Sequence, residues 1–172
     1  MTTLPGTAAK LLEVATKEIG TVEVPENKTK YGKYTKADGF PWCGSFVMWC
    51  ANQAKVVIPN CVSTQVGANA YKKSKRWVAA PTGPQPGDIV FFDFPHDGVD
   101  RISHVGIVVK DNLDGTCITI EGNTSGDEKG DQRNGGMVAK KVRAYKTNKK
   151  GIIVSIVGFG RPKFIDTPKE TK

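Results

Sequence analysis

The chain has 172 residues, of which 38% are apolar and 24% are charged, a balance typical of one ordinary globular domain. No run approaches the roughly 20 apolar residues that a transmembrane helix needs, so we expect no membrane insertion. The formal net charge of +8 favours a polyanionic partner, although a plainly solvated basic surface is the alternative. Because the chain has no zinc-finger spacing and no recognisable nucleic-acid motif, we expect no nucleic-acid partner.

We expect a single domain over residues 1–164, followed by a flexible polar tail or the start of a linker at 165–172. The first six residues lack a basic segment followed by an apolar run, so no secretory signal is predicted. Either the protein is made in the cytoplasm, or a leader has been removed from this sequence.

Hydrophobic periodicity predicts helices in the first half of the chain, at residues 7–20, from 43 to 54 or 55, and at 64–74. Thr7 and Ser63 or Thr64 are expected as N-caps, and Gly20 as a helix stop. Residues 25–38 are polar and are predicted as an extended surface loop. Strands follow at residues 88–94, 104–109, 117–121, 137–145 and 152–159. Helices followed by an antiparallel meander predict an α+β fold with about five to six strands.

Cys43 stands at the start of the second predicted helix, directly after Pro41 and Trp42. Backbone N–H groups in a first helical turn lack intrahelical partners, and the helix dipole favours negative charge there. A thiolate at this position has a lowered pKa and is a good nucleophile. We therefore single out Cys43 as the candidate nucleophile; a thiol that is merely packed is the alternative.

The other cysteines form no C-x-x-C pair, and Cys43 and Cys50 would lie about 10 Å apart along a helix, too far for a disulfide. We expect these three residues to be small buried hydrophobes: Cys50, Cys61 and Cys117.

A cysteine nucleophile needs a base, and the base needs a group that orients it. His104 begins a predicted strand and is preferred over His96, which lies in a loop. If the next strand pairs antiparallel through an even-numbered turn, His104 shares a sheet face with Glu121 and Asn123. An odd turn without a bulge would place them on opposite faces. From the residues alone, a solvated His104 and a Glu121 that belongs to a turn remain possible.

Four motifs occur in order, and they lie at residues 41–47, 86–92, 103–109 and 120–123. The distance from Cys43 to His104 is 61 residues, and that from His104 to Glu121 is 17. These motifs and intervals resemble the CHAP domain, the cysteine, histidine-dependent amidohydrolase/peptidase domain of phage endolysins and bacterial wall hydrolases. The resemblance extends over about residues 7–162.

The resemblance implies a papain-like fold and cleavage of peptidoglycan, either as an N-acetylmuramoyl-L-alanine amidase or as an endopeptidase. It implies that Cys43 is the nucleophile, His104 the general base and then acid, Glu121 the residue that orients His104, and Asn123 a fourth polar member. No cofactor is expected. The implied partners are peptidoglycan and anionic wall polymers, and the protein is expected to be a monomer that acts on the wall after release from the host cytoplasm.

The oxyanion is expected at the backbone N–H of Cys43, with an unranked side-chain donor from Asn27, Tyr31 or Tyr34. Trp42 is expected either to line the groove or to pack in the core. Some CHAP domains bind calcium through acidic residues before the nucleophile. Because this segment offers only Glu26, Asn27 and Asp38, no calcium is expected there.

The glycine-containing stretch 124–136 is expected to border the cleft. Its acidic residues, Asp127, Glu128 and Asp131, lack EF-hand spacing and are interpreted as a solvated loop. Two rival functions stay open: a zinc amidase that uses His96 and His104 with an acid or a cysteine, and a non-catalytic basic module that binds nucleic acid or wall polymer.

Overall fold

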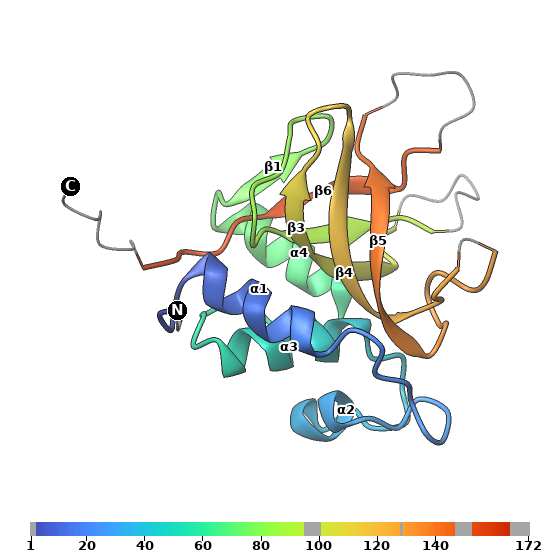
Figure 1. The fold of residues 1–172 in the computed structure, drawn as a ribbon. Coiled ribbons are helices and arrows are strands. Elements are labelled where there is room, and N and C mark those ends of the chain that lie inside the picture. The colour runs from blue at the N-terminus through green and yellow to red at the C-terminus, as the bar shows by residue number, and fades with distance from the viewer. Residues whose placement is uncertain (1–2, 95–100, 128, 147–152, 166–172) are drawn as a thin grey trace.

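The computed structural model describes residues 3–94, 101–127, 129–146 and 153–165. Within this part of the chain the helices come first: α1 (Ala8–Lys17), α2 (Lys30–Thr35), α3 (Cys43–Gln53) and α4 (Thr64–Lys73). The strands follow: β1 (Trp77–Ala79), β2 (Ile89–Phe92), β3 (His104–Asp111), β4 (Thr116–Thr124), β5 (Met137–Ala144) and β6 (Ile156–Gly160). The predicted α+β order is confirmed (Figure 1).

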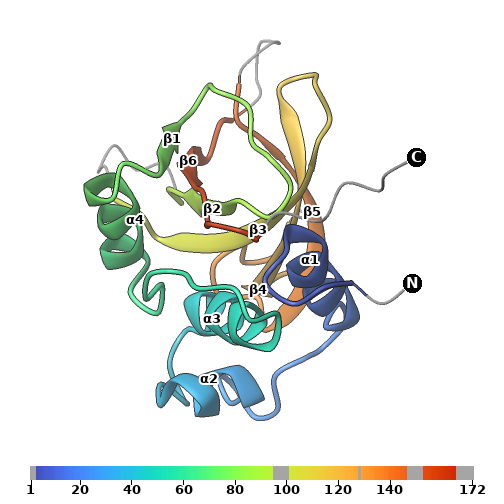
Figure 2. The same ribbon diagram turned by 90° about the vertical axis from the view of Figure 1, so that its left-hand side faces the viewer.

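The strands form one antiparallel sheet in the order β1-β6-β2-β3-β4-β5. Helices α1, α3 and α4 pack against it, and α2 lies outside α3 (Figure 1). Figure 2 shows the sheet strongly curved. Alternate strand residues build two cores, one beneath the helices around Phe46, Phe91 and Ile107, the other inside the curve around Phe92 and Phe159.

The predicted helices are confirmed with small differences at their ends. Thr7 caps α1 by accepting a hydrogen bond from the backbone N–H of Lys10 (3.1 Å), although the helix ends before Gly20. Helix α3 begins at Cys43, as expected, and Ser63 is the N-cap residue of α4.

Two short elements were not predicted. Residues 25–38 are not simply extended, because α2 forms within them and is capped by Thr29, which accepts from the N–H of Gly32 (3.0 Å). Its buried side chain, Tyr31, stacks on Trp42 with ring centroids 5.3 Å apart. Strand β1 is only three residues long and pairs with β6 at the sheet edge.

The pairing of β3 with β4 carries the site geometry. Near the turn, Asp111 pairs with Cys117, so five residues separate this pair and the turn is odd-numbered. The register then shifts between Val108 and Lys110, and beyond this irregularity Gly106 pairs with Glu121. The turn is therefore not the even-numbered one on which the shared face was conditional. The bulge compensates for the odd turn by adding one residue to β3. His104 and Glu121 therefore lie on the same face of the sheet.

The segment after β6 packs back onto the N-terminal region: the N–H of Ile165 donates to the carbonyl of Gly6 (3.0 Å). The predicted tail at 165–172 lies outside the described residues beyond Ile165. In the described ranges, no helix is long and apolar enough to cross a membrane.

Candidate active site

The first turn of α3 presents Cys43 to the sheet. Its N-cap residue, Trp42, makes no side-chain hydrogen bond to the helix, and the first intrahelical bond is donated by Phe46 to Trp42 (2.8 Å). The N–H groups before Phe46 therefore stay available to a negative charge at the helix start. Close packing fixes this end, because a Cβ on Gly44 would lie 2.0 Å from the carbonyl oxygen of Cys61.

His104, the candidate base, is the first residue of β3. His104 is fully buried, and its Nε2 lies 3.1 Å from Oε2 of Glu121. Its other ring nitrogen, Nδ1, is buried without an aligned hydrogen-bond partner, while the ring interacts with the Cys43 thiol. A loosely aligned pair of this kind is common in catalytic sites without substrate. Rings of Phe92 and Phe94 flank the imidazole, with centroids 5.5 and 5.9 Å away.

The pKa values of the pair shift toward a thiolate and an imidazolium. Burial alone raises the pKa of Cys43, but the charge and hydrogen bond of His104, with backbone groups of Gly44 and Val105, bring it below its ordinary value. Burial alone lowers the pKa of His104, but the sulfur of Cys43 and the carboxylate of Glu121 raise it to about 9. Each group thus favours the charged form of the other.

Glu121 is held by two residues that the sequence analysis did not identify. Its Oε1 accepts from Thr119 Oγ1 (2.5 Å) and Arg143 Nε (2.8 Å), and its Oε2 accepts from Arg143 Nη2 (2.7 Å). Burial raises the pKa of Glu121, but Arg143 and His104 outweigh it and lower the pKa to about 2. Alternation along β4 could have indicated Thr119, which lies two residues before Glu121.

Asn123 is fully buried near the end of β4 and has a positive φ of 58°. Its Nδ2 donates to Oδ1 of Asn134 (2.8 Å), and its Oδ1 accepts from the N–H of Gly136 (3.2 Å). These contacts tie its side chain to the stretch 124–136. They add no hydrogen bond to His104.

Two of the residues that were candidates for the groove or the oxyanion hole, Trp42 and Tyr31, are buried and hydrogen-bonded within the domain. Trp42 is fully buried and donates from Nε1 to Glu23 (2.5 Å), which favours its packing role over lining the groove. The Tyr31 hydroxyl donates to Glu18 (2.5 Å), so it is not free to act as an oxyanion donor. Asn27 and Tyr34 stay unranked; the side-chain oxygen of Asn27 is buried without a partner, and Tyr34 is exposed.

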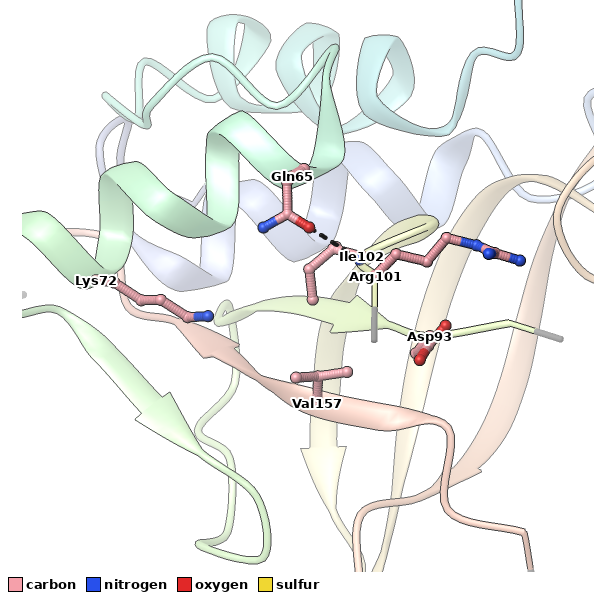
Figure 3. A pocket seen from close by; sticks show the side chains of 6 residues that line it. All are labelled: Gln65, Lys72, Asp93, Arg101, Ile102 and Val157. Atoms are coloured by element: carbon pink, nitrogen blue, oxygen red, sulfur yellow. Dashed lines mark hydrogen bonds between the residues drawn. The ribbon is translucent and has the colours of Figure 1, made fainter. Parts of the chain in front are cut away.

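The first turn of α4 fixes the approach to His104. Thr64 Oγ1 donates to the carbonyl of Ile102 (2.7 Å), and the Gln65 side chain accepts from the Ile102 N–H (3.1 Å). Figure 3 shows the Gln65 contact at the rim of a cavity of about 270 Å³, with Lys72 and Asp93 on opposite sides. Two hydrogen bonds thus fix the backbone of Ile102 just before β3.

A cavity of about 410 Å³ is lined by Phe94, whose ring lies 5.9 Å from the imidazole, and by Asp131, Gln132 and Arg133 of the stretch 124–136. That the stretch borders the active cleft stays a prediction. Hydrogen bonds hold the stretch in place: the N–H of Ser125 donates to the carbonyl of Asp131 (3.0 Å), and Lys141 Nζ donates to the carbonyl of Asp127 (2.9 Å).

The comparison with protein families matches the CHAP domain over residues 35–123, more than half of the chain. The chain belongs to the CHAP family. CHAP domains are cysteine, histidine-dependent amidohydrolases and peptidases that act on peptidoglycan, and the matched range contains all four predicted site residues: Cys43, His104, Glu121 and Asn123.

Among solved structures, the CHAP domain is similar to a Staphylococcus aureus protein described as similar to a lipoprotein of the NLP/P60 family. The identity is 15% and the TM-score 0.47, over 97% of this chain and 46% of the other. The chain therefore spans less than half the length of that protein. A comparison with curated proteins found no match.

The rival zinc site would need His96 and His104 together with an acid or a cysteine. His96 and Glu128 lie outside the described residues. Among the residues that the structure describes, no group of three or more His, Cys, Asp or Glu side chains could hold a metal ion.

The remaining cysteines are Cys50, Cys61 and Cys117. Each is a fully buried free thiol, as predicted.

Proposed function

We propose that this CHAP domain is an endolysin-type peptidoglycan hydrolase that cleaves an amide bond through a Cys43 acyl-enzyme. The observation that carries the proposal is the Cys43–His104–Glu121 arrangement, in which a thiol with a lowered pKa faces a buried histidine that is hydrogen-bonded to a carboxylate. This is the pattern of an activated cysteine nucleophile.

In the proposed reaction, the Cys43 thiolate attacks the carbonyl carbon of the scissile amide, and the oxyanion is stabilised by N–H groups at the start of α3. The C–N bond then breaks as His104 donates its proton to the leaving amine. Next, His104 takes a proton from water, which attacks the thioester. The carboxylic product leaves, and the thiolate–imidazolium pair is restored, while Glu121 holds the imidazole throughout.

The basic composition supports the wall as the place of action. From Gly39 to Gly87 the chain contains no acidic residue, yet it carries five cations: Lys55, Lys72, Lys73, Lys75 and Arg76. This stretch of the domain would be attracted to anionic wall polymers. The attraction should weaken with salt, because exposed charges are screened.

The test uses purified sacculi and mass spectrometry of the soluble products. Free stem peptides would identify an amidase, and shortened stems or cross-bridges an endopeptidase. Cys43→Ala and His104→Ala should each lower hydrolysis by at least 1,000-fold while the fold is retained, whereas Cys50→Ala, the same change at a buried thiol deeper in α3, should leave hydrolysis within a few-fold. Near wild-type hydrolysis by Cys43→Ala would exclude the mechanism.

A further inference from the structure

The Glu121 carboxylate accepts hydrogen bonds from Arg143 and Thr119 as well as contacting His104. His104 uses only one of its oxygens, whereas Arg143 contacts both of them, through Nε at 2.8 Å and Nη2 at 2.7 Å. Such a two-bond fork fixes the plane of a carboxylate as well as its charge. Thr119 adds a bond at Oε1, so the orientation that Glu121 presents to His104 is set by residues outside the predicted site.

Arg143 reaches this position from β5. In the ladder between β4 and β5, Cys117 pairs with Arg143 and Glu121 with Ala139. Ala139, Lys141 and Arg143 are buried, and the intervening Lys140 is exposed. Arg143 is only 7% exposed, so its charge is compensated inside the domain.

The same two aromatic rings shield Arg143 and His104. The guanidinium carbon lies 5.7 Å from the ring centroid of Phe92 and 5.3 Å from that of Phe94, the rings that also flank the imidazole. In this poorly hydrated environment, the geometry of each charged hydrogen bond matters more than at the surface.

Arg143 also joins the catalytic carboxylate to the cavity. Its Nη2 donates to Oε1 of Gln132 (2.9 Å), and Gln132 lines the cavity beside Phe94. Gln132 is in turn held by its own loop, because its Nε2 donates to the carbonyls of Asp127 (2.9 Å) and Gly130 (2.7 Å). One side chain therefore connects the wall of the cavity to the residue that orients the base.

We propose that Arg143 is a positioning residue of this CHAP domain, which acts through Glu121 to hold His104 against Cys43 and couples that geometry to the cavity-lining residue Gln132. The proposal rests on the proposed function for its relevance to hydrolysis. The effect of Arg143 on the Cys43–His104 pair can be measured without substrate. Lys141, two residues away, donates instead to the carbonyls of Ser125 and Asp127, so the two buried cations have separate roles.

The readout is the rate at which iodoacetamide alkylates Cys43, measured against pH, with Cys43→Ala as the blank. The groups that can affect this profile come from several elements: His104 on β3, Glu121 on β4, Arg143 on β5, Asp131 in the cavity loop and the neighbouring Cys61. Arg143→Gln removes a nearby cation, which disfavours the Cys43 thiolate, and it loosens Glu121, so that the imidazole is held less firmly against the thiol. We expect the rise of the Cys43 alkylation rate on the acid side of its pH profile to shift to higher pH by about one unit.

Arg143→Lys keeps the charge but cannot form the fork, so it should restore only part of the shift. The matched control is Lys140→Gln, which removes one positive charge from the exposed face of the same strand and should leave the profile unchanged. An unshifted Arg143→Gln profile would overturn the proposal, as would full restoration by lysine.

A double-mutant cycle distinguishes a positioning role of Arg143, exerted through Glu121, from a purely structural role. If Arg143 acts through Glu121, then Arg143→Gln should slow hydrolysis of dye-labelled sacculi by at least 10-fold in the wild-type background but by less than twofold in the Glu121→Gln background. Additive losses would contradict the proposal. The double variant leaves no unpaired buried charge, so it keeps the test usable if Arg143→Gln alone folds poorly. A shifted alkylation profile in a protein whose wild type leaves sacculi intact would support the positioning role and refute the proposed function.

Discussion

Gly106 lies directly opposite Glu121 across the β3–β4 pair, and a Cβ on Gly106 would lie 2.8 Å from Cγ of Glu121. It would also lie 3.1 Å from the carbonyl oxygen of Ile120. The missing side chain therefore provides the space through which the carboxylate reaches His104, two residues away on β3. Glycine at this position is explained by close packing, because Gly106 is not among the residues with a positive φ.

We predict that Gly106→Ala lowers hydrolysis of sacculi by at least 10-fold. Thr119 and Arg143 hold Glu121 on its other sides, so the carboxylate cannot move away without losing its hydrogen bond to His104. Overpacking should also lower the free energy of unfolding by about 1–3 kcal/mol. Lys110→Ala, an exposed change on the same strand, is the control. Equal activities of both variants, measured well below their unfolding temperatures, would contradict this explanation.

We predict that limited treatment with iodoacetamide at pH 7 modifies Cys43 alone. Burial raises the pKa of Cys61 and of Cys117 to about 12 and raises that of Cys50 well above its ordinary value, whereas the pKa of Cys43 is lowered. Peptide mass spectrometry should locate a single carbamidomethyl group on Cys43, and loss of activity should follow its appearance. Comparable labelling of Cys61 in the folded protein would count against the assigned reactivity.

The places of Cys43 and His104 in the fold were predictable because their signals are local. Cys43 depends on where one helix starts, and His104 on where one strand starts. The shared face of His104 and Glu121 was predicted on the condition of an even turn or of a bulge in an odd one. The structure has an odd turn and a bulge near Val109, and neither the sequence of the turn nor that of the strand shows this compensation.

Arg143 could not be predicted in the same way. Along β5 the apolar pattern is misleading, because Val142 is 60% exposed while Lys141 and Arg143 are buried. Their partners are a carboxylate and loop carbonyls that belong to β4 and to the stretch after it. The pairing of β4 with β5 also shifts register between Glu121 and Thr124. Helix α2 was missed for a simpler reason: six residues are too few to show a helical period.

Asp88, which belongs to the second of the four motifs, has a structural role in the fold. It is 1% exposed, and its two oxygens accept from Arg161 Nε (3.0 Å) and Nη2 (2.9 Å). Its Oδ2 also accepts from the N–H of Gln85 (2.8 Å). These bonds join the start of β2 to the segment that follows β6.

We predict that Asp88→Ala lowers the free energy of unfolding by about 1–3 kcal/mol, because the hydrogen bonds to charged Arg161 and to the Gln85 N–H are lost. In thermal unfolding this corresponds to a decrease of several degrees. Hydrolysis at 25 °C should stay within twofold of wild type, since none of these contacts reaches Cys43 or His104. A loss of activity without a loss of stability would show that Asp88 affects the site.

The pH dependence of hydrolysis should be set by the thiolate–imidazolium pair. Burial raises the pKa of Cys43, but the charge and hydrogen bond of His104 lower it below its ordinary value, so the thiolate forms at a lower pH than an ordinary cysteine thiolate does. Because the pKa of His104 is raised to about 9, the imidazolium persists above neutral pH. His104 must be protonated to donate to the leaving amine, so hydrolysis should be high near neutral pH and fall as pH rises through about 9. Glu121→Gln removes a carboxylate that favours the imidazolium, so the alkaline limb should move to lower pH. The measurement is the initial rate of dye release from labelled sacculi at constant ionic strength, from pH 5 to 10. Hydrolysis that still increases up to pH 10, or an alkaline limb that Glu121→Gln leaves in place, would be incompatible with His104 as the proton donor.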